Sequence, residues 1–491
     1  MNILFKKRNL KNKCIVLFLL LLSFSKVVFA AELPPEVVAQ TAILGEASTG
    51  KIIYEKDMDK KMYPASMTKL ITALVALDHL NADALLTVGT EINEIPWDSS
   101  KAGHLVGETL TVKNLIRGLL IPSGNDSANV LAVAVARKVK NDESLPFEEC
   151  INVFTELMNK KAKALGATNS HFANAHGYHD ENHYTTAHDM FFIAQEALKN
   201  QTIAEVAKEK GYSGDSAENT LESNGTLKTQ NYNWTNHNLL ITDNEYQYEY
   251  AIGLKTGFMD EAGDCLTAAA QKDGTTLIAV VCHSEDPARW TDTTSLFEYG
   301  FNNFTMANLQ KAGDVVNTVA LSGHNRLLGD TLDTVIKEDV QEYMLTEDIE
   351  NLETRIEYKN ELLAESKTEE QQLKAPIEKD AEVGKMVYQL GNEVIKEAPL
   401  YAATQVEKRT IGNSIQYAFK NLAANLFTIK GILTVVGIVA ILAILIVLLV
   451  TIKSRRNRRR SKYIFKSNRR NHSHRNYRYN DGPRMRKRRR R

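Results

Sequence analysis

Apolar and polar residues are unevenly distributed along the 491 residues of the chain, and their pattern predicts elements of several kinds. Residues 70–77 are almost wholly apolar and predict a buried helix, whereas residues 40–56 alternate around the turn "STG" and predict a β-hairpin. Helices are predicted on both sides of the break "PSGN" at 122–125, and strands around Gly turns at 250–286. Since strands come early and late with helices between them, the pattern predicts an α/β (α+β) domain whose single sheet is built from both ends, with a helical insertion.

The sequence predicts one main domain followed by three further segments. Residues 31–306 would form the main domain, and residues 310–406, with short strands and turns rich in Glu, a small β-rich spacer domain. Residues 407–430 predict an amphipathic linker helix. The 22 residues of 431–452 carry no charge and are long enough to cross a bilayer as a transmembrane helix.

The first 30 residues are typical of a signal peptide. A basic region precedes the apolar run "CIVLFLLLLSF", and "VFA" offers small residues for cleavage before Ala31. The alternative is a permanent N-terminal anchor, but the run is short for a span. The basic tail 453–491 directly follows the segment 431–452, and positive charge favours the cytoplasmic side. We therefore expect a single-pass protein of the cell membrane, with an extracellular domain and a cytoplasmic tail.

The formal net charge of zero hides a strong segregation of charge. The tail 453–491 holds 19 Lys and Arg residues and one acid, whereas residues 31–452 hold 35 basic and 59 acidic residues, a net charge of −24. An acidic body is not expected to bind nucleic acid. The tail could bind RNA, but anionic lipid headgroups beside its own span are the partner that its position favours.

The chemistry of the chain is concentrated first at the start of the apolar helix. Ser66 and Lys69 are three positions apart and share one helix face. A serine hydroxyl needs a base to become a nucleophile, and a lysine can be that base if burial or a neighbouring cation lowers its pKa. The bland alternative is an N-cap serine and a lysine whose amine reaches the solvent.

Two further stretches favour the nucleophile and its base over this alternative. "SGN" at 123–125 lies in a loop between two apolar helices, and "KTG" at 255–257 follows the start of an apolar strand. The ordered set of three elements is typical of β-lactamases and penicillin-binding proteins. Together with the flanking sequences "YPASMTKLITALVAL", "IPSGNDSANVLA" and "GLKTGFMDEAGDCLTAAA", it makes the chain resemble the low-molecular-weight penicillin-binding proteins that act as serine-type D-alanyl-D-alanine carboxypeptidases.

The resemblance covers residues 41–303 well and the region up to 406 more loosely. It implies a penicillin-recognising serine transpeptidase/β-lactamase-like fold, in which an antiparallel sheet of about five strands lies between helical layers. It implies catalytic roles for Ser66 as the acylated nucleophile, for Lys69 as its general base, and for Ser123, which would pass the proton to the leaving amine.

The resemblance also implies how the substrate binds. Asn125 would hold the backbone amide of the peptide, Lys255 and Thr256 would bind its terminal carboxylate, and Gly257 would let it lie against the strand. The backbone N–H groups of Ser66 and Phe258 would form the oxyanion hole. The implied partners are peptidoglycan stem peptides and, as covalent inhibitors, β-lactam antibiotics; no cofactor is implied.

Three features depart from this pattern or offer another interpretation. Glu156 and Asn159 imitate the spacing of a deacylating β-lactamase element, but they lie in an amphipathic helix that the carboxypeptidases share. The histidine-rich loop at 171–188 has no metal-binding frame, so we expect structural hydrogen bonds and no metal there. Phe258 stands where some relatives have His, and only its backbone N–H is required.

The cysteines allow one geometric prediction. If Asp273-Gly274 is a two-residue hairpin turn, Cys265 and Cys282 face each other across two strands. Two buried thiols and a cross-strand disulfide both fit this placement.

The sequence therefore predicts a membrane-anchored enzyme that removes the terminal D-Ala from stem pentapeptides through an acyl-enzyme on Ser66. Endopeptidase and transpeptidase activities differ from this only in the leaving or attacking amine. The alternative from another class is a membrane receptor that β-lactams acylate and that does not turn over.

Overall fold

The computed structural model describes residues 33–215, 231–365, 371–426 and 428–467. The predicted signal peptide and the end of the basic tail, residues 468–491, lie outside these ranges. The chain divides into two compact units. The first contains the described residues up to Asp314 together with Ile336–Glu357 and Gly384–Leu400, and the second contains Val315–Val335, Tyr358–Val383 and the described residues from Tyr401 on.

A five-stranded antiparallel sheet forms the centre of the first unit, with the strand order β2-β1-β9-β8-β7. Its strands come from both ends of this part of the chain, as the sequence predicts. They are β1 (Thr41–Glu46), β2 (Ile52–Lys56), β7 (Ala251–Met259), β8 (Gly263–Lys272) and β9 (Thr275–Ser284).

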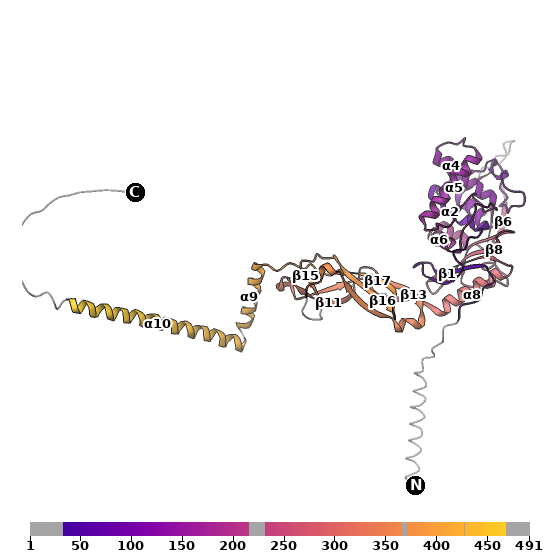
Figure 1. Cartoon of the computed structure of the whole chain (residues 1–491). Helices are drawn as coiled ribbons and strands as arrows, with labels where there is room; N and C mark the ends of the chain where they lie inside the picture. Colours follow the sequence, from indigo (N-terminus) through magenta and orange to yellow (C-terminus); the bar gives the residue numbers. More distant parts are fainter. Residues whose placement is uncertain (1–32, 216–230, 366–370, 427, 468–491) are drawn as a thin grey trace, which may run out of the picture. The chain divides into compact units, whose positions relative to one another are not determined.

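Both faces of this sheet are covered, and alternate residues of one strand enter different cores. In β9, Leu277 and Ala279 face the core that includes α8 (Ala288–Asn303), whereas Ile278 and Val280 face the larger helical core. This explains why the strands are apolar at nearly every position. The sheet between helical layers that the resemblance implies is confirmed (Figure 1).

The larger helical layer is built around α2 (Lys69–His79), whose residues from Lys69 to Ala76 are all buried. The predicted buried helix is therefore confirmed. Around it lie α3 (Val112–Leu120), α4 (Asn125–Lys140), α5 (Phe147–Ala164), α6 (Ala187–Lys199) and α7 (Gln201–Ala207).

Short elements connect the helices with the sheet. The ones nearest the site are the 3-10 helix η1 (Ala65–Thr68), which runs directly into α2, and the hairpin of β5 (Gly211–Asp215) and β6 (Asn231–Thr235). The others are β3 (Leu85–Thr87), η2 (Thr90–Asn93) and β4 (Thr109–Thr111).

The chain after α8 is rich in strands, as predicted. In the first unit, β10 (Phe304–Gln310) pairs with β13 (Val340–Leu345). In the second unit, β11 (Val315–Ser322) pairs with β12 (Thr331–Val335) and, in parallel, with β15 (Gln372–Lys374). The remaining elements of this region are η3 (Arg326–Leu328), η4 (Thr346–Asn351), β14 (Glu353–Tyr358), η5 (Asn360–Leu362), β16 (Glu382–Leu390) and β17 (Glu393–Ala402).

Two helices follow in the second unit. The amphipathic linker appears as α9 (Ile411–Leu426), which exposes Ile411, Ile415 and Phe419. The last helix, α10 (Ile429–Ser467), contains one stretch, Lys430–Arg456, that is apolar and long enough to cross a membrane. This stretch includes the segment 431–452 predicted to span the bilayer.

The hairpin turn predicted at Asp273-Gly274 is present, with Lys272 opposite Thr275. The register shifts between Asp264 and Leu266, so that Cys265 of β8 lies opposite two residues of β9, Cys282 and His283, which form a bulge. Cys265 and Cys282 are both buried and are free thiols, the first of the two alternatives that the sequence left open.

Candidate active site

The two residues of the first motif lie at the junction of η1 and α2. Ser66 belongs to the 3-10 helix, in which residues three apart are eclipsed, and Lys69 is the first residue of α2. The Nζ atom of Lys69 is 2.7 Å from the Oγ atom of Ser66. Ser66 is not the N-cap of either helix, and the lysine is fully buried. The alternative of a capping serine with a solvent-reaching lysine is therefore wrong.

The amine of Lys69 has two more partners, which belong to other elements. It donates to Oδ1 of Asn125, at the start of α4, at 2.8 Å, and to the carbonyl oxygen of His176 at 2.8 Å. A neutral amine has two N–H donors and one lone pair. If the two donors serve Asn125 and His176, the lone pair points to the Ser66 hydroxyl, which is the arrangement of a general base.

The surroundings of Lys69 favour this neutral amine. Burial, and after it the positive charge of Lys255, hold the pKa of Lys69 well below its usual range, although the Asp126 carboxylate raises it. His176 is buried beside Lys69, and burial lowers its pKa to about 3, so that its ring is neutral. His183, also buried with a pKa of about 3, contacts the hydroxyl of Thr68 at 2.8 Å.

The loop that carries His176 must approach η1 very closely. Gly177 has φ +87°, and a Cβ atom there would lie 1.8 Å from the carbonyl oxygen of Ala65. Only glycine fits this position, since any other residue would have to adopt a left-handed backbone conformation and its Cβ atom would clash with Ala65. The histidine-rich loop thus positions a carbonyl for Lys69. The rings of four of its histidines take part in hydrogen bonds, whereas Nδ1 of His179 is buried without a partner; the four are His171, His176, His183 and His188.

The third motif lies on β7, next to η1. A Cβ atom on Gly257 would be 2.8 Å from the carbonyl oxygen of Pro64, so glycine lets the strand pack against the start of the nucleophile helix. Lys255 is almost fully buried, and its Nζ contacts the carbonyl oxygen and the hydroxyl of Thr256. Burial, and then Arg289, lower its pKa to about 7.

A cleft of about 690 Å³ brings the motifs together. Six of the eight predicted site residues line it, and the other two, Lys69 and Lys255, are buried close to them. The six are Ser66, Ser123, Asn125, Thr256, Gly257 and Phe258. Phe258 is exposed, whereas Ser123 is buried and has the unusual φ of +63° for a non-glycine residue.

The cleft also contains residues that sequence reasoning missed. Arg289, from the first turn of α8, lines it and adds a second cation close to Lys255. Asp98, Tyr178 and His237 line it as well, and the Tyr178 hydroxyl donates to Asp98 at 3.3 Å. No motif marks these residues, because they reach the cleft from loops or element ends far apart in the sequence.

Two interpretations that the sequence disfavours can be compared with the geometry. Glu156 is exposed on α5 and does not line the cleft, and both amide atoms of Asn159 bond the backbone of Phe172. Among the residues that the structure describes, no group of three or more His, Cys, Asp or Glu side chains is arranged to hold a metal ion.

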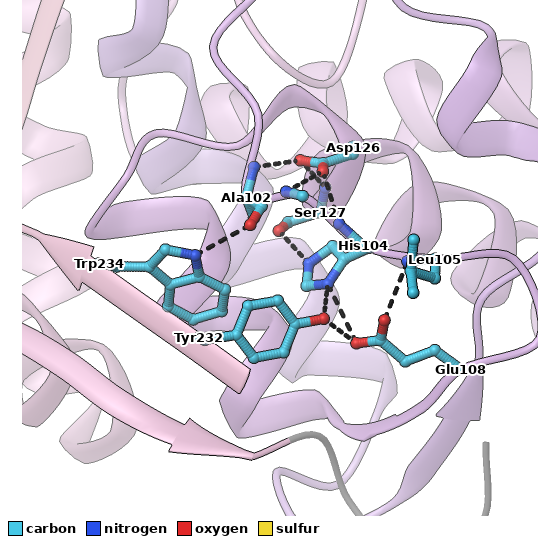
Figure 2. A network of polar contacts seen from close by, with 9 residues as sticks. Ala102, His104, Leu105, Glu108, Asp126, Ser127, Tyr232 and Trp234 are labelled. Carbon is cyan, nitrogen blue, oxygen red and sulfur yellow. Dashed lines mark hydrogen bonds and ion pairs between the residues drawn. The ribbon is translucent and has the colours of Figure 1, made fainter. Parts of the chain in front are cut away.

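A buried polar network includes Asp126 and Ser127, the two residues that follow the motif 123–125 in the chain (Figure 2). The His104 ring contacts the Ser127 hydroxyl at 2.8 Å and the Tyr232 hydroxyl at 2.9 Å, and Tyr232 donates to Glu108. Burial, and then Glu108, raise the pKa of Tyr232, so its hydroxyl keeps its proton and acts as a donor. The network joins the loop before β4 to α4 and β6.

Comparison with known proteins places the chain among enzymes of one kind. A family model described as D-alanyl-D-alanine carboxypeptidase matches residues 28–286, and one described as penicillin-binding protein 5, C-terminal domain, matches residues 304–408. The D-alanyl-D-alanine carboxypeptidase DacF of Bacillus subtilis is 31% identical over 403 residues, which cover 79% of this chain and 92% of DacF.

Other relatives agree with this result. DacA of Escherichia coli, also a D-alanyl-D-alanine carboxypeptidase, is 27% identical and is matched over 78% of this chain and 87% of its own length. Among solved structures, penicillin-binding protein 5 from Haemophilus influenzae has a TM-score of 0.61 at 24% identity, covering 77% of this chain and all of that one. The last match supports the fold alone.

Proposed function

This chain belongs to the D-alanyl-D-alanine carboxypeptidase family, and we propose that it removes the terminal D-Ala from peptidoglycan stem pentapeptides through an acyl-enzyme on Ser66. The observation that carries the proposal is the contact of 2.7 Å between Lys69 Nζ and Ser66 Oγ, made by an amine whose pKa is lowered well below its usual range. A neutral amine at this distance can take the hydroxyl proton as the oxygen attacks a carbonyl.

In the acylation step, Ser66 Oγ attacks the carbonyl carbon of the penultimate D-Ala, and its proton passes to Lys69. The backbone N–H groups of Ser66 and Phe258 stabilise the oxyanion. Ser123 passes a proton to the leaving amine, and the bond to the terminal D-Ala breaks. Attack by water on the ester then releases the shortened peptide and restores the Ser66 hydroxyl.

Binding of the substrate depends on attraction between the negative charge of the peptide and the positive charges at the cleft. The peptide ends in a carboxylate, which the buried amine of Lys255 would attract and Thr256, on the wall of the cleft, would bind; Arg289 adds a second cation. Asn125 uses its Oδ1 atom for Lys69, which leaves its Nδ2 donor for a carbonyl of the peptide. The same nucleophile would open the amide of a β-lactam and form a covalent penicilloyl-enzyme.

The segments after the catalytic domain would hold this cleft outside the cell. We infer that residues 31–306 form the catalytic domain, that residues 310–406 form a spacer, and that the apolar stretch of α10 crosses the membrane. The basic residues after the stretch favour a cytoplasmic tail that contacts anionic lipid headgroups.

The test is the release of D-alanine by the purified chain in detergent from a peptide that ends in D-Ala-D-Ala, measured beside its Ser66→Ala variant. Sustained release by the first and none by the second is the expected result. If the unaltered chain releases no D-alanine but is stably labelled by a fluorescent penicillin, turnover is excluded and the receptor interpretation replaces the enzyme.

A further inference from the structure

The carboxylate of Asp126, in the first turn of α4, is buried and fully engaged by backbone N–H groups (Figure 2). Its Oδ1 atom accepts from Ala102 N at 2.8 Å and from Ser127 N at 3.0 Å. Its Oδ2 atom accepts from Gly103 N at 2.8 Å and from His104 N at 3.2 Å. One side chain of α4 thus fixes three consecutive residues of a loop more than twenty positions earlier in the chain.

This loop forms part of the wall of the cleft. Ser99 and Ser100, separated from the three fixed residues by Lys101 alone, line it. The backbone N–H of Asn125 donates to the carbonyl oxygen of Ser100 at 2.9 Å, while the Asn125 side chain accepts from Lys69 at 2.8 Å. Asp126 follows Asn125 in the chain, so the wall and the partner of Lys69 are held from adjacent positions of one helix turn.

The loop is fixed from its other side by β6. Trp234 donates from Nε1 to the carbonyl oxygen of Ala102 at 2.9 Å. His104 joins the Ser127 hydroxyl to Tyr232, the neighbour of Trp234 on the same face of β6. Since buried polar groups with every partner in place specify one arrangement, the loop has little freedom to move relative to α4.

Asp126 also brings a negative charge close to Lys69. The charged and titratable groups around Lys69 are Lys255 of β7, His176 and His183 of the loop before α6, and Asp126 of α4, with His237 on the wall of the cleft. Lys255 lowers the pKa of Lys69, and Asp126 raises it. Loss of the Asp126 charge would therefore lower the pKa of Lys69 further.

We propose that Asp126 is a positioning residue for the reaction proposed above: its carboxylate holds Asn125 and the cleft wall at Ser99 and Ser100 in one arrangement around Lys69. The proposal rests on that function, because it assigns a role within the same site. Asp126 does not line the cleft and acts through the residues that it fixes.

The test uses Asp126→Asn, which keeps the size of the side chain but removes its charge and turns one acceptor into a donor that faces backbone N–H groups. We expect the rate constant of acylation by a fluorescent penicillin to fall 10- to 100-fold. We also expect the acid limb of its pH profile to move to lower pH. The fall in rate reports on positioning, whereas the shift of the limb reports on the loss of the Asp126 charge near Lys69; a loss of stability alone would not move the limb.

Asp292 of α8 offers a matched control within the same unit. It is a buried aspartate that accepts from Val38 N at 3.1 Å and Ala39 N at 2.9 Å, and it does not line the cleft. Asp292→Asn should lower the melting temperature as Asp126→Asn does, but it should leave the acylation rate within about twofold and the acid limb in place.

A second variant, Trp234→Phe, keeps Asp126 and removes one hydrogen bond to the same loop. It should reduce acylation less than Asp126→Asn, without moving the acid limb, and it keeps the proposal open to refutation if Asp126→Asn does not fold. Two outcomes overturn the role of Asp126 and leave the proposed function intact. One is an acylation rate of Trp234→Phe equal to that of the unaltered chain. The other is an Asp126→Asn variant whose acylation rate and acid limb equal those of the Asp292→Asn control. A chain that neither releases D-alanine nor binds penicillin before any substitution overturns the proposed function, and the role of Asp126 falls with it.

Discussion

Lys69 and Ser66 meet at the point where a 3-10 helix becomes an α-helix, with Nζ and Oγ 2.7 Å apart. The spacing of three residues is enough to bring the two side chains together, because residues three apart in a 3-10 turn are eclipsed and point to the same side. What makes the pair chemically useful is its surroundings. A lysine at the same spacing on an exposed helix would keep its proton at neutral pH and could not act as a base.

The first prediction concerns this base. Lys69→Met keeps a long unbranched side chain but removes the amine, so that nothing takes the Ser66 proton. We expect the rate constant of acylation by penicillin to fall by about 10²- to 10⁴-fold, the usual contribution of general base catalysis. Stopped-flow measurement of labelling checks it.

The control for this prediction is Lys163→Met, since Lys163 lies near the end of α5 and outside the cleft. Its acylation rate should equal that of the unaltered chain. Acylation of Lys69→Met at a rate within tenfold of the unaltered chain would mean that another group is the base.

The second prediction concerns pH and Lys255. Its pKa of about 7, lowered by burial and Arg289, means that the amine loses its charge as the pH rises through that value. Only the charged amine attracts a carboxylate, so kcat/KM for a peptide with a free C-terminus should fall above about pH 7. Lys255→Arg stays charged across this range and should lose that alkaline limb.

A ligand without a carboxylate separates this effect from general inactivation at high pH. Acylation by a neutral β-lactam ester should show no alkaline limb near pH 7 in either protein. If the limb appears with the ester, or persists in Lys255→Arg, the group that titrates is not Lys255.

Much of the site could be predicted because its motifs are short and local. Ser66 with Lys69, and Lys255 with its two neighbours, each depend on one turn or one strand, and their order along the chain identifies the set. The turn at Asp273-Gly274 could be predicted for the same reason, since φ is +50° and +84° there and the two residue types tolerate it.

The rest depends on contacts between distant segments, which no local pattern encodes. Arg289 reaches the cleft from the start of α8, and Asp126 fixes a loop that precedes it by more than twenty residues. The hairpin of β5 and β6 is not among the predicted elements, and its strands contain several polar residues that weaken the alternation of apolar positions. The bulge of β9 at Cys282 and His283, opposite Cys265, was missed because a turn determines the register only as far as the strands stay regular.

The third prediction concerns the thiols. Cys150, Cys265 and Cys282 are all fully buried, so an alkylating reagent should not modify them in the folded chain. After unfolding in denaturant without reductant, all three should be alkylated, because the structure holds free thiols. Mass spectrometry of the peptides measures this. A cross-linked pair of peptides from β8 and β9 would instead show that the purified chain carries a disulfide.

The last prediction separates the two helices at the C-terminus. The stretch Lys430–Arg456 has a mean hydropathy of 3.4 over its most apolar 18 residues, so a chain that retains it should stay in the membrane fraction at high salt and high pH. A chain that ends at residue 426 keeps only α9, whose exposed Ile411, Ile415, Phe419 and Leu422 recur at helical spacing. Such a helix binds a bilayer surface weakly, so alkaline carbonate should extract this chain.

A chain that ends at residue 410 lacks both helices and should be released without extraction, while a chain that ends at residue 467 should behave like the full chain. Immunoblots of the fractions, with D-alanine release measured in each, check this series. Activity should follow the protein into the soluble fraction, because every residue assigned to the site lies before residue 290. If the chain ending at residue 426 resists carbonate as the full chain does, α10 is not what anchors the protein.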